Sequence, residues 1–311
     1  MKEPAKLLDA LRRDRDNIAA AAGLDAAGFL LGADESVADY IDRCARLLVE
    51  AEKLIRRSGE GKTTLAPGVK VGKRDRIPAN IAAEAGDITD SLYSFRIDWA
   101  PGFFVNERMG FLWGGCSWYD PESGALTYII RSAFRNRAKW GIYERGELIA
   151  HELCHAAHAP LAFDQLEEFF AYQTSRKHFR RYMGNCFIRG YDAFLFIMPP
   201  FLVLAVQLLN IFMSWSIPIW PLWVLGVAVV LWFLGRNQLA RNRFFRAVRV
   251  LHEGGVAAAN AVLFRCTNEE IGEIGGLERG EFDEYLERKC ADALRWRVIR
   301  HRFVEVKEHE A

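Results

Sequence analysis

This sequence lacks an excess of either charge, paired cysteines and an apolar leader. Its 41 basic and 40 acidic residues nearly balance over 311 residues, which leaves no overall charge to attract nucleic acid. Its six cysteines form no C-x-x-C pair, which argues against a zinc ribbon and against the disulfide framework of a small secreted protein. We expect mostly reduced, buried cysteines, with a disulfide as the alternative. The charged N-terminus lacks the apolar segment of a signal peptide.

One long stretch of the sequence lacks charged residues: residues 193–235 contain no Asp, Glu, Lys or Arg. This stretch divides into two apolar runs, 193–213 and 217–234, each long enough to cross a hydrocarbon core of about 30 Å as a helix. The pattern therefore predicts a transmembrane helical hairpin. Pro199 and Pro200 predict a kink and leave a re-entrant hairpin open. A buried helical pair in a soluble core is the other alternative.

Basic residues flank both ends of the predicted hairpin, and none lies in its turn. By the positive-inside rule this pattern predicts that both termini lie in the cytoplasm. The expected membrane is the inner or plasma membrane. The same residues are suited to contact anionic headgroups. They are Arg176, Lys177, Arg180, Arg181 and Arg189 before the hairpin, and Arg236, Arg241, Arg243, Arg246 and Arg249 after it. We therefore expect an integral membrane protein whose remaining parts are cytosolic.

Composition and hydrophobic periodicity divide the chain into four regions. Residues 1–75 have helical periodicity, and residues 76–190 mix strand-like and helical sequence. Residues 191–236 contain the hairpin, and residues 237–311 read as basic and then mixed-charge helix. The expected fold class is α+β, with helices on a small sheet at the centre, helical regions at both ends and a transmembrane hairpin.

Within the mixed region, aromatic and β-branched runs alternate with Gly, Pro, Asn and Asp turns. The strand-like runs cover residues 92–99, 111–118 and 126–130, and helical sequence begins near Ile142. Further along, Thr267 is followed three residues later by a Glu, which predicts a capping box at the start of a helix.

The chemically informative stretch is residues 147–160, ELIAHELCHAAHAP. His151 and His155 are four residues apart, so on a helix they project from one face and can bind one zinc ion. Glu152 lies beside the first ligand, where it can take a proton from zinc-bound water and later pass it to a leaving amine. The H-E-x-x-H pattern thus predicts a zinc site with its own general base and acid. The alternative is a helix with unrelated surface histidines.

This motif resembles that of the zincin metallopeptidases over about residues 95–175. Metzincins require a Gly and then a third His at positions that hold His158 and Leu161 here. Gluzincins instead use a Glu on a following helix, commonly within Glu-x-x-Ala, and residues 168–171 fit that pattern. The resemblance to gluzincins therefore implies zinc held by three residues: His151, His155 and Glu168.

Other residues remain alternatives for the third ligand. Asp164 would give an aspzincin-like site and His158 is a further candidate, whereas Glu167 should point elsewhere if Glu168 faces the metal. The combination with a membrane hairpin also resembles the membrane-embedded CAAX-processing and stress-response proteases. Because the hairpin in those proteases separates H-E-x-x-H from the third ligand, Glu253 is a minor alternative.

The surroundings of the motif can also be read from the sequence. Residues 124–132 are expected to form a strand, and in the resembled family an edge strand lies beside the zinc and pairs with extended peptide substrate. Cys154 should point off the metal face into the core. A donor that stabilises the oxyanion is also expected, with four candidates: Tyr143, Tyr172, His178 and Tyr182.

The expected function is that of a membrane-anchored zinc metallopeptidase that uses Glu152 as general base and acid. Its expected partners are peptide or protein substrates, including membrane-associated ones, and the lipid bilayer. Charged residues around His151 exclude this helix from hydrocarbon, so the site is expected in the cytosol near the bilayer surface. The alternative is a non-catalytic or latent zincin-fold membrane protein that acts as adaptor or sensor through residues 1–75 and 237–311.

Overall fold

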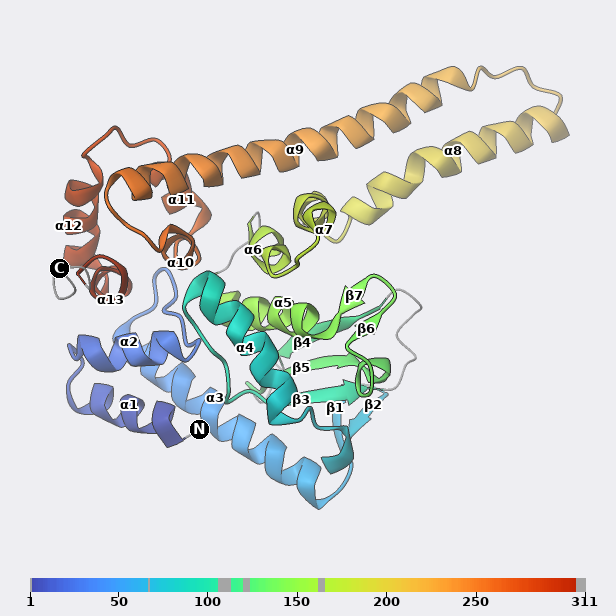
Figure 1. Ribbon diagram of the computed structural model, residues 1–311. Coiled ribbons are helices and arrows are strands. Elements are labelled where there is room, and N and C mark those ends of the chain that lie inside the picture. Colours follow the sequence, from blue (N-terminus) through green and yellow to red (C-terminus); the bar gives the residue numbers. More distant parts are fainter. Residues whose placement is uncertain (1, 67, 106–112, 120–123, 162–165, 306–311) are drawn as a thin grey trace.

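The computed structural model of this chain describes residues 2–66, 68–105, 113–119, 124–161 and 166–305. The protein is a mixed α+β molecule in which helices predominate and the sheets are small (Figure 1). A long helical hairpin extends from one side of the body. The α+β class expected from the sequence is therefore confirmed at this level.

The N-terminal region consists of α1 (Lys2–Arg13), α2 (Ile18–Ala26) and α3 (Val37–Glu60). Side-chain caps begin two of these helices, because Asn17 accepts a hydrogen bond from the Ala20 amide and Ser36 from the Asp39 amide. The periodic apolar residues of α3 are buried, as the helical pattern predicts. The region ends in β1 (Thr63–Ala66), β2 (Val69–Val71) and η1 (Lys73–Asp75).

The sheet that positions the site contains β3 (Gly102–Val105), β5 (Leu126–Arg131) and β4 (Gly115–Tyr119), in that spatial order. β3 runs parallel to the central strand β5, and β4 runs antiparallel to it with Ser117 opposite Tyr128. α4 (Ala79–Tyr93) packs against α5 (Arg145–His158), and α5 also contacts β4 and β5. The η2 turn (Ser132–Phe134) and the small hairpin of β6 (Lys139–Trp140) and β7 (Tyr143–Glu144) lead into α5.

The predicted strand runs have mixed outcomes. The run 126–130 lies within β5, and the described part of the run 111–118 includes most of β4; Phe111 and Leu112 lie outside the described residues. The run 92–99 was wrongly predicted, since α4 continues to Tyr93 and no strand follows in residues 94–99. Its aromatic residues are buried as an irregular segment instead: Trp99 stacks on Phe29 with ring centroids 4.3 Å apart.

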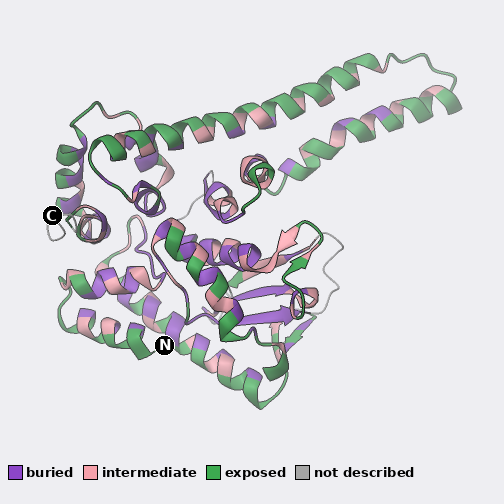
Figure 2. Ribbon diagram, in the orientation of Figure 1, coloured by how far each residue is buried: buried purple, intermediate pink, exposed green. Residues whose placement is uncertain are grey.

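The charge-free stretch forms α8 (Asp192–Phe212) and the first half of α9 (Trp220–Glu253). Within the described residues, these are the two helices long and apolar enough to cross a membrane, with mean hydropathies of 2.1 and 1.5 over their most apolar windows. Only 11% of each window is buried inside the protein, and Figure 2 shows exposed residues along most of the hairpin. The alternative of a helical pair buried in a soluble core is therefore wrong. α8 continues through Pro199 and Pro200.

The regions outside the hairpin share a main hydrophobic core, and a smaller cluster lies between α3, β2, β3 and β5. Beyond α9, the chain forms α10 (Ala259–Leu263), α11 (Asn268–Ile274), α12 (Phe282–Asp292) and α13 (Leu294–Phe303). The predicted capping box at Thr267 is present. Buried Arg265 donates hydrogen bonds to Asp25 and to the Tyr93 carbonyl, linking the C-terminal, N-terminal and central parts. The predicted segments 1–75, 76–190 and 237–311 thus pack together, and the division at residue 236 falls inside the continuous helix α9.

Candidate metal centre

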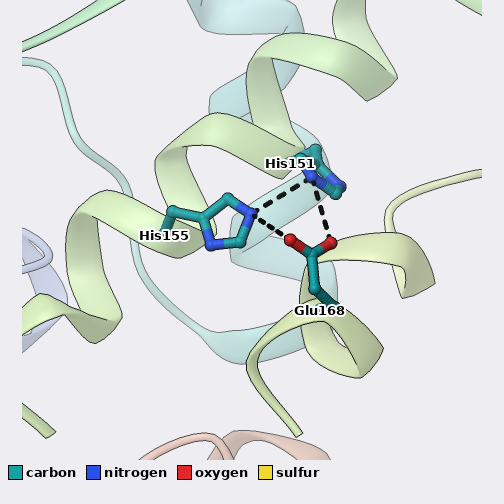
Figure 3. Close-up of side chains that lie close together, drawn as sticks. All are labelled: His151, His155 and Glu168. Atoms are coloured by element: carbon teal, nitrogen blue, oxygen red, sulfur yellow. Dashed lines mark hydrogen bonds and ion pairs between the residues drawn. The ribbon is translucent and has the colours of Figure 1, made fainter. Parts of the chain in front are cut away.

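The two histidines of the motif lie on one face of α5. Their Nε2 atoms are 3.2 Å apart, because a separation of four residues places side chains one above the other on a helix (Figure 3). Leu148, Ile149 and Leu153 are buried in the core and fix the rotation of the helix about its axis. These buried apolar residues of α5 therefore aim both imidazoles at one point.

Glu168 completes the cluster from α6 (Glu167–Gln173). Its Oε1 lies 3.6 Å from Nε2 of His155, and its Oε2 lies 3.7 Å from Nε2 of His151. All three ligand atoms lie within 4.8 Å of one another. Zinc bonds of about 2.0–2.2 Å in tetrahedral geometry separate ligand atoms by roughly 3.3–3.6 Å, so the spacing of this donor set fits zinc after small side-chain adjustments.

The position of α6 follows from its own apolar residues. The chain leaves α5 through the short turn η3 (Ala159–Leu161), and α6 then buries Phe169 and Phe170 completely. Phe169 packs on Phe244 of α9, and Phe170 packs on Phe264, which follows α10. Because these two aromatic residues face the core, the preceding Glu168 faces the histidines.

Glu167 is not part of the group of ligand atoms, as predicted, but it contacts the other side of the His155 ring. Nδ1–H of His155 donates to Oε1 of Glu167 at 2.6 Å. This contact arises because both glutamates lie in the first turn of a short helix, where their long side chains diverge around one imidazole. A carboxylate on the second nitrogen of a ligating histidine fixes its tautomer and raises its basicity.

Glu152 is buried beside the cluster. Burial raises its pKa to about 7, although the positive charge of His155 and a hydrogen bond from the Ser117 backbone oppose this rise. A carboxylate with a pKa near neutrality can both accept and return a proton at physiological pH. The predicted base thus lies beside the predicted ligands with a protonation equilibrium suited to its role.

The two histidines have opposite electrostatic environments. Burial, together with the charges of His155 and Arg180, lowers the pKa of His151 to about 3. Burial alone would also lower the pKa of His155, but the hydrogen bond to Glu167 and the nearby carboxylates of Glu168 and Glu152 outweigh it and raise that pKa to about 9. Three carboxyl groups surround the two imidazoles, and a metal bound at this position would displace the Nε2 proton of His155.

The cluster opens into a cleft of about 470 Å³ between α5 and β4. Gly115, Cys116 and Ser117 of β4 form one wall, and Ala156 and Ala159 contribute to the other. Among the described strands β4 pairs with β5 alone, so β4 is the edge strand beside the cluster. The strand expected at residues 124–132 is present as β5, but β5 is central in the sheet. The edge strand beside the cluster is β4, which pairs antiparallel with β5.

The alternative ligands lie elsewhere. His158 is buried with its ring stacked on Phe264 at 3.8 Å, and its Nε2 lies 2.7 Å from the Phe264 carbonyl oxygen. Glu253 is exposed at the end of α9, and Asp164 lies outside the described residues. Cys154 is buried in the core, as predicted, and all six cysteines are free, which excludes the disulfide alternative.

Of the four oxyanion candidates, Tyr172 lies nearest to the cluster. Its ring contacts that of His151 edge-on at 4.7 Å, and burial together with the charge of Glu168 raises its pKa to about 12. His178 and Tyr182 contact Arg181 and Gln238 instead. The ring of Tyr143 lies under Arg180, with the guanidinium carbon 4.9 Å from the ring centroid.

Sequence reasoning did not single out Arg180 as a site residue. Its guanidinium lies near the rings of Tyr143 and Tyr172, and its charge contributes to the low pKa of His151. The sequence shows it only as one member of a basic cluster. The sequence does not distinguish Arg180 from its exposed neighbours, because its burial depends on tertiary packing. Arg180 lies on α7 (His178–Met183), which contacts α6, and it pairs with Glu147 of α5 at 3.4 Å.

No protein-family model, curated protein or solved structure was found to match this chain. The H-E-x-x-H motif and the geometry of the cluster are therefore the features of the chain that indicate a function.

The Glu167 contact yields a first prediction. Glu167→Ala is expected to weaken zinc binding by about 10- to 100-fold, because His155 loses the carboxylate that orients its ring and raises its basicity. Competition against a chromogenic chelator measures the affinity. Glu284→Ala, at an exposed position on α12, is the matched control and should leave the affinity unchanged. Equal affinities for the two variants would contradict the role given to Glu167.

Proposed function

We propose that this protein is a zinc-dependent peptidase of the gluzincin type, anchored in a membrane by α8 and α9. The observation that carries the proposal is the convergence of His151, His155 and Glu168 within 4.8 Å, with buried Glu152 beside them in a cleft. His151, His155 and Glu168 would hold the zinc. When bound, zinc lowers the pKa of water and polarises a substrate carbonyl.

The other catalytic roles fall to residues of this chain. Glu152 accepts a proton from the attacking water and returns it to the leaving amine, and Glu167 holds the ring of His155 in place. Among the described strands β4 pairs on one side only, and its other edge, next to the cleft, would pair with the main chain of an extended peptide by strand addition. Tyr172 is the candidate nearest to His151 for stabilising the oxyanion.

The tether favours substrates at the membrane. The basic residues that flank the hairpin support a cytoplasmic location for the body of the protein and both chain ends. Since the chain between the cluster and α8 is short, the cleft lies close to the bilayer. Segments of membrane proteins that emerge from the bilayer, or proteins recruited to its surface, are the proposed substrates.

The direct test is metal-dependent hydrolysis. Zinc-loaded protein in detergent is expected to cleave unstructured peptides of mixed sequence, as followed by mass spectrometry of the products. Removing zinc with a chelator should lower the rate to background, because both the nucleophile and the carbonyl lose their activation, and added zinc should restore it. Cleavage that persists after the metal has been removed would exclude the zinc mechanism.

A second candidate is a latent peptidase that acts as a sensor. The observation in its favour is that α9 runs without interruption from the hairpin to Glu253 and packs on α6, where Arg241 lies over the Phe169 ring at 5.5 Å. A displacement of α9 in the membrane would reach the helix that carries Glu168. This candidate predicts that hydrolysis is weak in detergent and increases when α9 is perturbed by a ligand or partner.

A further inference from the structure

Two large apolar side chains are exposed close to the base of the hairpin. Ile142, in the β6–β7 turn, is 60% exposed, and Phe179, on α7, is 75% exposed. Ile142 lies at the tip of a pair of two-residue strands, and Phe179 lies on a six-residue helix. Neither side chain is buried by the rest of the protein. Exposed apolar groups that cluster beside a membrane anchor mark a contact with another apolar phase.

These residues belong to one continuous surface. The Lys177 ammonium group, immediately before α7, donates to the Ile142 carbonyl at 3.1 Å and so joins the β6–β7 turn to α7. Figure 1 shows α7 beside the first turn of α8, and the β6–β7 hairpin on the same side of the body. Phe187, between α7 and α8, packs on Phe196 and Phe233 of the hairpin.

Basic side chains predominate on this surface, and the acidic residue nearest to Ile142 in the sequence, Glu144, is paired with Lys139 at 2.7 Å. From Phe169 to His252 the sequence contains a single acidic residue, Asp192, and its carboxylate is paired with Arg236 at 2.6 Å. Arg176, Lys177 and Arg189 are exposed in the same stretch. An apolar tip surrounded by basic side chains matches a leaflet that contains anionic lipids, whose headgroups attract lysine and arginine.

We propose that Ile142, Arg176, Lys177, Phe179 and Arg189 form a docking surface that lies on an anionic lipid leaflet beside the hairpin. The two apolar side chains enter the headgroup region, and the basic ones contact lipid phosphates. Direct continuity with the hairpin favours lipid over a protein partner, because insertion of α8 and α9 brings this surface to the leaflet. The inference rests on that proposed insertion.

Docking fixes the orientation of the cleft. α7 follows α6 after a short link, and α6 carries Glu167 and Glu168. Because the β6–β7 hairpin also leads directly into α5, both helices of the metal cluster are attached to elements that contact the leaflet. The docked protein would hold its cleft next to the membrane surface. The cleft would then face chain segments that leave the bilayer and would disfavour substrates that are free in solution.

The experiment measures depth in the membrane. Full-length protein carrying Cys116→Ser receives one spin label at a time, through Ile142→Cys or Phe179→Cys, and is placed in nanodiscs. The lipid is either phosphatidylcholine or its mixture with phosphatidylglycerol. The collision rate of the spin label with oxygen, relative to its collision rate with a water-soluble nickel complex, reports the depth of the label in the membrane. Val224→Cys in α9 marks the hydrocarbon core, and Val49→Cys on α3 marks water; both positions are exposed on the protein.

The expected result is a several-fold higher oxygen preference at residues 142 and 179 than at residue 49 in the anionic nanodiscs. Arg176→Gln with Lys177→Gln should remove most of this difference, whereas Arg12→Gln with Arg13→Gln, an exposed pair on α1, should not. Labels at 142 and 179 that are as aqueous as that at 49 would overturn the docking surface, and so would equal depth in both lipids. An aqueous label at 224 would instead overturn the insertion of the hairpin.

Discussion

Replacing His155 by alanine is expected to leave the purified protein without zinc, where the wild type holds about one ion per chain. His155 contributes one of the three ligand atoms, and its loss leaves His151 and Glu168, whose atoms lie 3.7 Å apart. Two protein ligands hold zinc far more weakly than three. Elemental analysis of detergent-purified protein after zinc loading and gel filtration measures the difference.

His178→Ala is the matched control. His178 is exposed on α7, and its ring contacts Arg181 rather than the cluster, so this variant should keep its zinc. Far-UV circular dichroism of both variants checks that the fold persists, which is expected because α5 keeps its buried apolar face. Zinc that is retained in His155→Ala, or absent from the wild type after loading, would mean that the motif binds no metal.

The local parts of this site could be predicted from the sequence. The placement of His151 and His155 on one face requires only helical geometry, and the spacing to Glu168 requires only a turn and a new helix. The two apolar helices were predictable for the same reason, since a long stretch without charge is a local property. In each case, residues close in the sequence determine the outcome.

The long-range parts could not be predicted in this way. β4, rather than residues 124–132, lies at the sheet edge because of the order in which strands pair, which periodicity does not encode. Glu167 reaches His155, and Arg180 approaches Tyr143 and Tyr172, only after α6 and α7 have packed on the rest of the protein. The buried contact of His158 with Phe264 likewise joins residues far apart in the chain.

The continuity of α9 has a consequence for how the fold should be divided. The sequence changes from apolar to basic near residue 236, which suggested a boundary, but a helix can continue through a change in composition as long as its backbone hydrogen bonds are kept. α9 therefore connects the predicted membrane segment directly with Phe244, which packs against Phe169 of α6. The contact between Phe244 and Phe169 thus links the predicted membrane segment to the helix that carries Glu168.

Glu152→Gln is expected to keep zinc and to lower kcat by about 10²- to 10⁴-fold, the usual contribution of a general base. Glutamine has nearly the same shape as glutamate, so the cleft and the ligand atoms should stay in place, but it cannot accept the proton of the attacking water. Product formation from an unstructured peptide, measured beside zinc content, separates a lost base from a lost metal. Glu284→Gln, at an exposed site, should keep full activity.

The pH dependence provides a separate test of the same role. Burial raises the pKa of Glu152 to about 7, and the carboxylate, which is the active form, is lost as the pH falls through the pKa. A bound cation favours the carboxylate, so the acid limb of kcat/KM in the zinc enzyme should lie at or below about pH 7. Zinc content measured across the same range excludes protonation of His155 as the cause. Residual activity of Glu152→Gln should lack this limb; full activity in that variant, or an unchanged limb, would show that another group takes the proton.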